Sequence, residues 1–412
     1  MIIRGKGILC WWLIGGVAFA MSSARADAVT DWNALACAAL LEAKSPPGPA
    51  HRTLAMAHTA VYEAANAITQ RYPASRLQLA APPGASVAAA VAAANRAILD
   101  RLVPSQQAAI DSAYAAAIER VAEGAAKTDG IAVGENAARL VLDARAADGA
   151  AAVAVESWRP ATAAGVYVPT AMPVSGQWAQ RTPWLMGSAA DMRPGPPAVL
   201  EGAIWARDYN EVKAIGGKRS TLRSAEQSAI AKFWEATQPS IFYELVRGVA
   251  SRPGRDVMRN ARLFAAMAQG IDDAIIAVFD AKYHYNFWRP LTAIRNGDVD
   301  GNAATERDPT WLPFLDTPMH PEYPCAHCVA SGVVGAVLAA EIGAVGTPLL
   351  STSSPSANGA TRSWKTLDGF MQEVASARIY GGMHFRYSTE VGTATGKRIG
   401  ALAAAWFQIR PD

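Results

Sequence analysis

Three short stretches in the second half of the chain combine positive charge with histidine: residues 282–290, 319–328 and 377–388. Four aromatic residues surround the two cations of the first stretch. Cations in an apolar setting need an anion to offset their desolvation, and histidine exchanges protons near neutral pH. The pattern therefore indicates an anion site with acid–base chemistry. Its candidate side chains are Lys282, Arg289, His320, His327, Arg378 and His384.

The second stretch leads into a helix that should be buried. Residues 329–340 are apolar on nearly every face, which is typical of a helix without contact to water. Its N-terminus would fall near Cys325, Ala326 and His327. Free backbone N–H groups and the helix dipole attract an anion at such a place.

Helix geometry predicts how the other two stretches present their side chains. If residues 282–289 are helical, Lys282 and Arg289 lie within about 20° of the same face, and we expect Pro290 to end that helix. Arg378 and His384 would lie on different faces of a continuous helix. We expect the Gly-Gly pair between them to break the helix and to bring His384 round to the same site.

Composition favours a large helical protein. The chain has 412 residues, is 51% hydrophobic and carries a formal net charge of +3, which is enough for two domains or one large one. Few segments alternate with a period of two residues, so we predict a mainly α-helical protein. The positive charge is spread along the chain, which argues against nucleic acid as a partner.

The predicted helices form a bundle of antiparallel helices with the site between their ends. A soft boundary near residue 190 separates an amino-terminal helical region, 27–190, from a bundle, 191–412. Residues 302–323 are predicted to form a loop over the site, and 345–363 a polar loop. The expected helices are 31–43, 51–68, 86–102, 105–121, 130–148, 199–216, 224–236, 242–252, 255–281, 367–380 and 389–408.

The start of the chain is typical of a secretory signal. Arg4 and Lys6 precede an apolar run at 8–21, and Ala24-Arg25-Ala26 is a small-x-small cleavage site, so we expect residues 1–26 to be removed. No later run reaches the length of a membrane span. The expected location is the periplasm or the medium, with no membrane partner after cleavage.

The three stretches together resemble the vanadium-dependent haloperoxidases and the related acid phosphatases of the phosphatidic acid phosphatase type 2 (PAP2) superfamily. The family pattern is Lys-x6-Arg-Pro, then Pro-Ser-Gly-His, then Ser-Arg-x5-His-x3-Asp. Lys282, Arg289 and Pro290 match the first part, Pro324 and His327 the second, and Arg378 and His384 the third. Residues 32–33 and 52–68 look like the amino-terminal helices of the bacterial haloperoxidase-like branch. The departures are Cys325 for Ser, Ala326 for Gly, Ala377 for Ser and Ser388 for Asp.

The resemblance implies an all-α fold and vanadate as the cofactor. Hydrogen peroxide would oxidise a halide to hypohalite, and a small organic acceptor and a homodimer are compatible with it. His384 would be the vanadium ligand, or the phosphorylated nucleophile in a phosphatase, and His327 the general acid–base. The oxyanion would be bound by Lys282, Arg289, Arg378, Cys325 and the backbone N–H of Ala326.

Three positions modify these expectations. Ser388 cannot hold His384 with the charge of a carboxylate, which should lower the basicity of that histidine. Cys325 is a poorer hydrogen-bond donor than serine, and it could form a disulfide with Cys328. His320 stands where family chloroperoxidases have Phe and algal bromoperoxidases have His, which favours bromide and iodide over chloride.

Other functions remain open on the sequence. One is an acid phosphatase that acts through a phosphohistidine, and another is an exported, non-catalytic oxyanion-binding relative. The Cys-x-x-Cys pair also suggests a thiol–disulfide oxidoreductase, but no βαβ pattern surrounds it. The long amino-terminal helical region is absent from small phosphatases, and it favours the haloperoxidase.

Overall fold

The computed structural model describes residues 27–73, 77–152, 162–169, 171–343 and 346–411, so the predicted signal peptide lies outside the described residues. These form thirteen α-helices, five short 3-10 helices and one two-stranded sheet, which confirms the all-α class. The first helices are α1 (Ala28–Glu42), α2 (Pro47–Thr69), α3 (Val87–Leu102), α4 (Gln107–Glu119), α5 (Ala125–Ala144), α6 (Ala203–Ile215) and α7 (Ala225–Phe233). The others are α8 (Ser240–Ala250), α9 (Val257–Tyr285), α10 (Pro290–Arg295), α11 (Ala326–Ile342), α12 (Leu367–Tyr380) and α13 (Arg386–Trp406).

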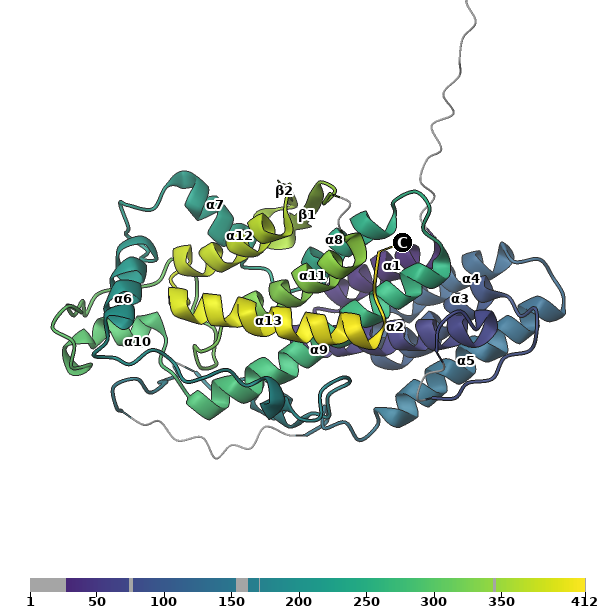
Figure 1. Cartoon of the computed structure of the whole chain (residues 1–412), viewed down its shortest axis with the longest axis horizontal. Coiled ribbons are helices and arrows are strands. Elements are labelled where there is room, and N and C mark those ends of the chain that lie inside the picture. The colour runs from purple at the N-terminus through teal and green to yellow at the C-terminus, as the bar shows by residue number, and fades with distance from the viewer. Residues whose placement is uncertain (1–26, 74–76, 153–161, 170, 344–345, 412) are drawn as a thin grey trace, which may run out of the picture.

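The helices are arranged along an elongated molecule (Figure 1). Helices α2 to α5 gather at one end, and α6 and α10 lie at the other. Between them run α9, α11 and α13. Helix α11 is buried along most of its length, as its apolar sequence predicts. No helix among the described residues is long and apolar enough to cross a membrane.

Glycines bring α11 and α13 into close parallel contact. A Cβ atom on Gly396 would lie 2.0 Å from the carbonyl oxygen of Val329, and one on Gly392 would lie 2.7 Å from that of Cys325. Only a residue without a side chain allows the two backbones to approach this closely. The N-terminal ends of both helices are thereby fixed at the same place, beside the C-terminal ends of α9 and α12.

An aromatic cluster supports this place from the side of α6. The ring of Trp205 packs 4.7 Å from that of Phe385 and 5.8 Å from that of Trp288. Tyr323 belongs to the same buried cluster. Trp288 and Phe385 are adjacent in sequence to Arg289 and His384, so the cluster positions the backbone at both of these residues.

The amino-terminal helices continue the core of the bundle. Helix α2 packs against α9, and buried residues of both belong to one hydrophobic cluster. The buried guanidinium of Arg181 donates to Asp272 of α9 at 2.7 Å and to Asp148 at 2.9 Å. These ion pairs tie the segment after α5 to α9. The boundary near residue 190 stays a prediction.

Two predicted local structures are wrong. The polar loop at 345–363 contains an antiparallel hairpin of β1 (Leu350–Ser354) and β2 (Ala360–Trp364). Its signal was the Asn358-Gly359 pair, which adopts the positive φ values of 53° and 77° that such a turn needs. Helix α10 was also missed, because Pro290 was expected to end a helix. It begins one instead, at the first helical position.

Candidate active site

The loop at 319–325 is the centre to which the predicted cations converge. Lys282, in the last turn of α9, is fully buried, and its Nζ donates to the carbonyl oxygens of Pro321 at 3.0 Å and Glu322 at 2.8 Å. Arg289 donates through Nε to the carbonyl oxygen of His320 at 2.9 Å. The expectation that both cations reach one place is confirmed.

The route by which they converge differs from the prediction. Helix α9 ends at Tyr285, where Asn286 adopts a left-handed conformation with φ of 47°. Arg289 is extended and stands immediately before α10. Lys282 and Arg289 therefore do not share a helix face. The direction of the Arg289 side chain is set by a turn and not by helical spacing.

Arg289 links two histidines of the site. Its Nη2 contacts Nδ1 of His320 at 2.9 Å, and the same Nδ1 lies 3.2 Å from the carbonyl oxygen of Pro321. Its Nη1 contacts Nε2 of His384 at 3.1 Å and the carbonyl oxygen of Met383 at 2.9 Å. A guanidinium can only donate, so Nε2 of His384 must accept. His384 is therefore neutral, with its proton on Nδ1 and its lone pair on Nε2.

Glu322 accepts the other proton of His384. Nδ1–H of His384 donates to Oε1 of Glu322 at 2.7 Å, and the backbone N–H of Phe385 donates to the same oxygen at 3.0 Å. A carboxylate thus pairs with His384 from a position other than 388, and the effect of Ser388 on the basicity of His384 stays a prediction. The sequence analysis missed Glu322, although an acid within an otherwise uncharged, proline-rich approach to a buried helix was a signal.

Arg378 reaches the site as predicted, because α12 ends at Tyr380 and the chain turns at Gly382, with φ of 76°. Its Nη1 donates to the carbonyl oxygen of Trp234 at 2.6 Å, and its Nη2 contacts Sδ of Met383 at 3.2 Å. Its Nε is buried and has no hydrogen-bond partner in the described residues. This donor is available to a bound group.

His327 lies in the first turn of α11 and is half-buried. Its Nε2–H donates to the carbonyl oxygen of Ala236 at 3.1 Å. The carbonyl can only accept, so the lone pair of the ring is on Nδ1. This tautomer makes His327 a base. Within the described residues, the backbone N–H groups of Ala326 and His327 have no protein acceptor, as expected at a helix start.

Cys325 differs from its expected role. Its sulfur is bonded to that of Cys328 in a disulfide and accepts from the backbone N–H of Cys328 at 3.3 Å. It caps the N-terminus of α11. A disulfide sulfur has no hydrogen to donate, so in this state Cys325 cannot be a donor to an oxyanion.

The electrostatics of the site favour an anion. Burial lowers the pKa of Lys282 well below its usual value, that of Arg289 to about 10 and that of Arg378 to about 9. Burial and the neighbouring cations also keep the pKa values of His320, His327 and His384 well below the usual value. Burial raises the pKa of Glu322 to about 7, against the pull of Arg289 and Lys282.

These residues fit a tetrahedral oxyanion. Three cations of the site are buried, and one histidine offers a lone pair. Within the described part of the chain, an arginine Nε is unpaired and two helix N–H groups have no acceptor. A bare metal ion fits less well. Among the described residues, no group of three His, Cys, Asp or Glu side chains could hold one.

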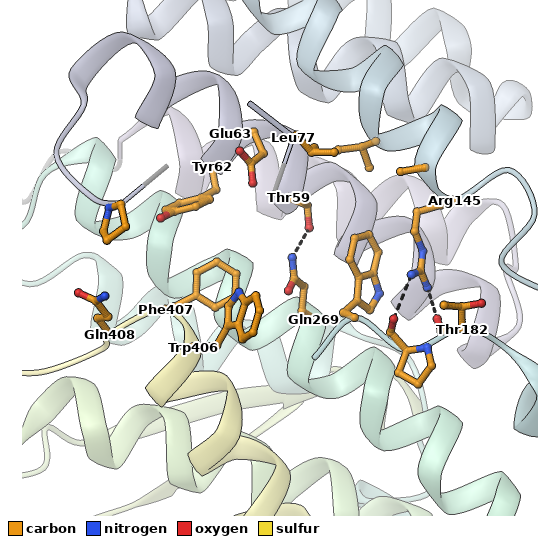
Figure 2. Close-up of a pocket in the computed structure, with 15 residues that line it drawn as sticks. Thr59, Tyr62, Glu63, Leu77, Arg145, Thr182, Gln269, Trp406, Phe407 and Gln408 are labelled. Atoms are coloured by element: carbon orange, nitrogen blue, oxygen red, sulfur yellow. Dashed lines mark hydrogen bonds between the residues drawn. The ribbon is translucent and has the colours of Figure 1, made fainter. Parts of the chain in front are cut away.

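A separate cavity of about 560 Å³ lies between the amino-terminal helices and the end of α13 (Figure 2). Tyr62, Trp406 and Phe407 form its aromatic side, and Gln269 donates to Thr59 at 2.9 Å across its floor. None of the site's cations or of His320, His327 and His384 lines it. Oxyanion chemistry therefore belongs to the site around the 319–325 loop.

Comparison with known proteins supports the fold. Residues 262–410 match the family model for the VCPO second helical-bundle domain. The vanadium chloroperoxidase of Curvularia inaequalis is 28% identical over 172 residues, which are 34% of this chain and 28% of that protein. This chain thus matches little more than a quarter of the length of that relative.

Two solved structures share the fold over nearly the whole chain. A bacterial vanadium-dependent iodoperoxidase superposes with a TM-score of 0.76 at 23% identity, covering 93% of this chain and 97% of that one. An apo-type bacterial vanadium-dependent chloroperoxidase gives 0.72 at 15% identity, covering 87% and 92%. Residues 262–410 are thus similar to the second helical bundle of the vanadium chloroperoxidases, and the chain shares the fold of solved bacterial vanadium-dependent haloperoxidases.

Proposed function

We propose that this chain is a vanadate-dependent haloperoxidase that oxidises bromide or iodide with hydrogen peroxide. Halide, peroxide and a proton are consumed, and hypohalous acid and water are formed. The observation that carries the proposal is the burial of Lys282, Arg289 and Arg378 around the lone pair of a neutral His384.

Each residue has a defined task in this reaction. Lys282, Arg289 and Arg378 offset the negative charge of vanadate and hold its oxygens, and Nε2 of His384 supplies the ligand lone pair. Bound vanadate supplies a Lewis acid that polarises peroxide for attack by halide, without a change in its oxidation state. His327, whose Nδ1 is a free base, takes the proton that peroxide loses.

The preference for bromide and iodide is proposed from His320. Its ring packs edge-on against Phe279 with centroids 5.2 Å apart, and its Nδ1 contacts Nη2 of Arg289 at 2.9 Å. An N–H donor beside the site would hold a halide ion. The likeness to a solved iodoperoxidase is in line with this preference. Export through residues 1–26 would place the reaction, and any small organic acceptor, in the periplasm or the medium.

An acid phosphatase is the second candidate function. The pairing of His384 with a carboxylate, which leaves Nε2 as a nucleophile, would also suit attack on phosphorus. In that reaction His327 would have to protonate the leaving group. Its low pKa favours the neutral base instead, which supports the first proposal.

One pair of assays separates the two functions. Purified protein is tested for bromination and iodination of a dye with peroxide, with and without added vanadate, and for release of nitrophenol from its phosphate ester. We expect vanadate-dependent halogenation that phosphate inhibits, because phosphate has the same shape and competes for the cations. Nitrophenol release without halogenation would identify a phosphatase instead.

The same assay tests the halide preference. Values of kcat/KM for iodide, bromide and chloride at pH 6 should fall in that order, with little chloride activity. Chlorination as efficient as bromination would contradict the role given to His320.

A further inference from the structure

We propose that Glu322 is the positioning residue of His384. Its carboxylate, on the 319–325 loop, takes the place of the Asp that the family pattern has four residues after the histidine. The inference rests on the proposed function only in taking His384 as the oxyanion ligand. It assigns a role to a residue that lies outside the family pattern of Lys, Arg, His and Asp.

The contact has the geometry of a carboxylate–histidine pair. Glu322 is fully buried, and Oε1 is 2.7 Å from Nδ1 of His384. The same oxygen accepts from the backbone N–H of Phe385 at 3.0 Å, so it holds both the ring and the chain that carries it. Such a partner fixes the tautomer and orientation of a ligating histidine and raises its basicity.

The tautomer matters because the two ring nitrogens of His384 have different partners. Nε2 faces Arg289, which can only donate. If the proton moved to Nε2, it would point at the guanidinium and leave no lone pair for a ligand. Glu322 prevents this by accepting the proton on Nδ1.

The backbone of Glu322 joins the same loop to the rest of the site. Its N–H donates to the carbonyl oxygen of Phe287 at 2.9 Å, and its carbonyl oxygen accepts from Nζ of Lys282 at 2.8 Å. Position 322 thus contacts the segment of Arg289, the lysine and the histidine. A carboxylate on this loop sets His384 relative to the cations, whereas one on α13 would set it relative to the helix that follows it.

Ser388, at the position of the family's Asp, lies beside this carboxylate. It is buried and lines the same small cavity as Glu322. The two positions can therefore exchange the carboxylate. This makes a swap experiment possible within one chain.

The experiment compares Glu322→Ala, Glu322→Gln and the double variant Glu322→Ala with Ser388→Asp. Vanadate and phosphate binding are measured by calorimetry, and the tautomer of His384 is read from ¹⁵N chemical shifts of histidine-labelled protein without anion. Glu235→Gln is the matched control, because it removes an exposed acid that acts on Arg378.

We expect Glu322→Ala to weaken vanadate binding by about 10- to 100-fold and to shift His384 toward the Nε2–H form. Glu322→Gln, which keeps an acceptor oxygen, should lose less, and it carries the test if Glu322→Ala fails to fold. The double variant should regain both the Nδ1–H signal and most of the affinity. Glu235→Gln should keep the wild-type tautomer.

Wild-type affinity and tautomer in Glu322→Ala, or in Glu322→Gln where only that variant folds, would overturn the inference. A double variant with the same affinity and tautomer as Glu322→Ala would also contradict the inference. It would mean that a carboxylate at position 388 does not take over the role given to Glu322. The proposed function is judged separately. If wild-type protein binds vanadate but does not halogenate, the proposed function fails while the binding and tautomer results still decide the role of Glu322.

Discussion

Histidine tautomers in the site are set by neighbours that can act in only one way. Arg289 donates to His384, whereas the carbonyl of Ala236 accepts from His327. Burial keeps the pKa values of both rings well below the usual value, so each ring is neutral and presents a known nitrogen. The two histidines take opposite forms, with the lone pair on Nε2 in His384 and on Nδ1 in His327. The form of His384, which is held through Nδ1, suits a ligand, and the form of His327 suits a base.

Removing the histidine that is proposed as the ligand should abolish vanadate binding. In His384→Ala, we expect vanadate binding and peroxide-dependent halogenation to be lost, because no other described side chain offers a lone pair at that place. Glu322 would lose a buried partner, so the free energy of unfolding should fall by about 1–3 kcal/mol. Calorimetric titration and denaturant unfolding measure the two effects. His284→Ala, at an exposed position on the same helix as Lys282, is the control. Full vanadate-dependent activity in His384→Ala would show that the ligand is misassigned.

At the scale of elements, the site depends on the contact between α11 and α13. In Gly396→Ala, the added methyl group would meet the carbonyl oxygen of Val329, so the helices must separate. Overpacking of this kind costs about 1–3 kcal/mol or more. We expect lower stability in urea and weaker vanadate binding, because α11 carries the N–H groups of the site. The matched variant Gly248→Ala, on an exposed face of α8 with nothing within 4 Å of the added atom, should be slightly more stable. Equal stability of the two variants would mean that the helices are not held by this contact.

The first turn of α11 also carries the Cys325–Cys328 disulfide. Reduction gives Cys325 an S–H group, a weak donor that the disulfide lacks. We expect the reduced protein to bind phosphate more tightly than the disulfide form. Phosphate is the better probe here because thiols reduce vanadate. Cys325→Ser, which has a hydroxyl donor and cannot form the bond, should bind at least as tightly as the reduced protein in calorimetry. The same affinity in all three forms would show that this position does not contact the anion.

At the scale of the whole molecule, two buried histidines of α2 link the amino-terminal helices to the core. The ring of His58 stacks 5.0 Å from that of Phe264, and its Nε2 accepts from Asn33 at 2.9 Å. Burial lowers the pKa of His58 to about 3, assisted by Arg247, and that of His51 to about 4, against the pull of Asp272. Neither ring can be charged in the folded protein near neutral pH.

These pKa shifts predict a loss of stability in acid. The unfolded chain takes up protons on both histidines below about pH 6.5, whereas the folded protein does not. The contribution of the two histidines to the free energy of unfolding should therefore be fully present above pH 6.5. It should fall as the pH drops toward 4, by up to about 1.4 kcal/mol per pH unit for each histidine. Denaturant unfolding at several pH values measures the slope. His58→Gln should lower stability at pH 7 but give a shallower decline, whereas His284→Gln should leave the slope unchanged. An unchanged slope in His58→Gln would contradict the assignment.

The sequence by itself determined the helices and most of the site. Helix periodicity and the breaks at Gly381 and Gly382 are local properties, so they predicted the all-α fold and the return of His384 toward Arg378. The family pattern selected Lys282, Arg289 and His327 because its spacing is written in consecutive residues. Buried packing of α11 followed from its lack of a polar face.

Tertiary structure decided what depends on partners far apart in the chain. Glu322 and His384 are separated by 62 residues, and no local pattern shows that a carboxylate lost from α13 returns from the opposite loop. The same holds for Arg289. The direction of its side chain is set by the left-handed conformation of Asn286 and by hydrogen bonds to the carbonyl oxygens of His320 and Met383. A buried hydrogen bond needs the right donor and acceptor in the right place, but not a particular element to supply them. Such partners are therefore fixed only when the helices pack.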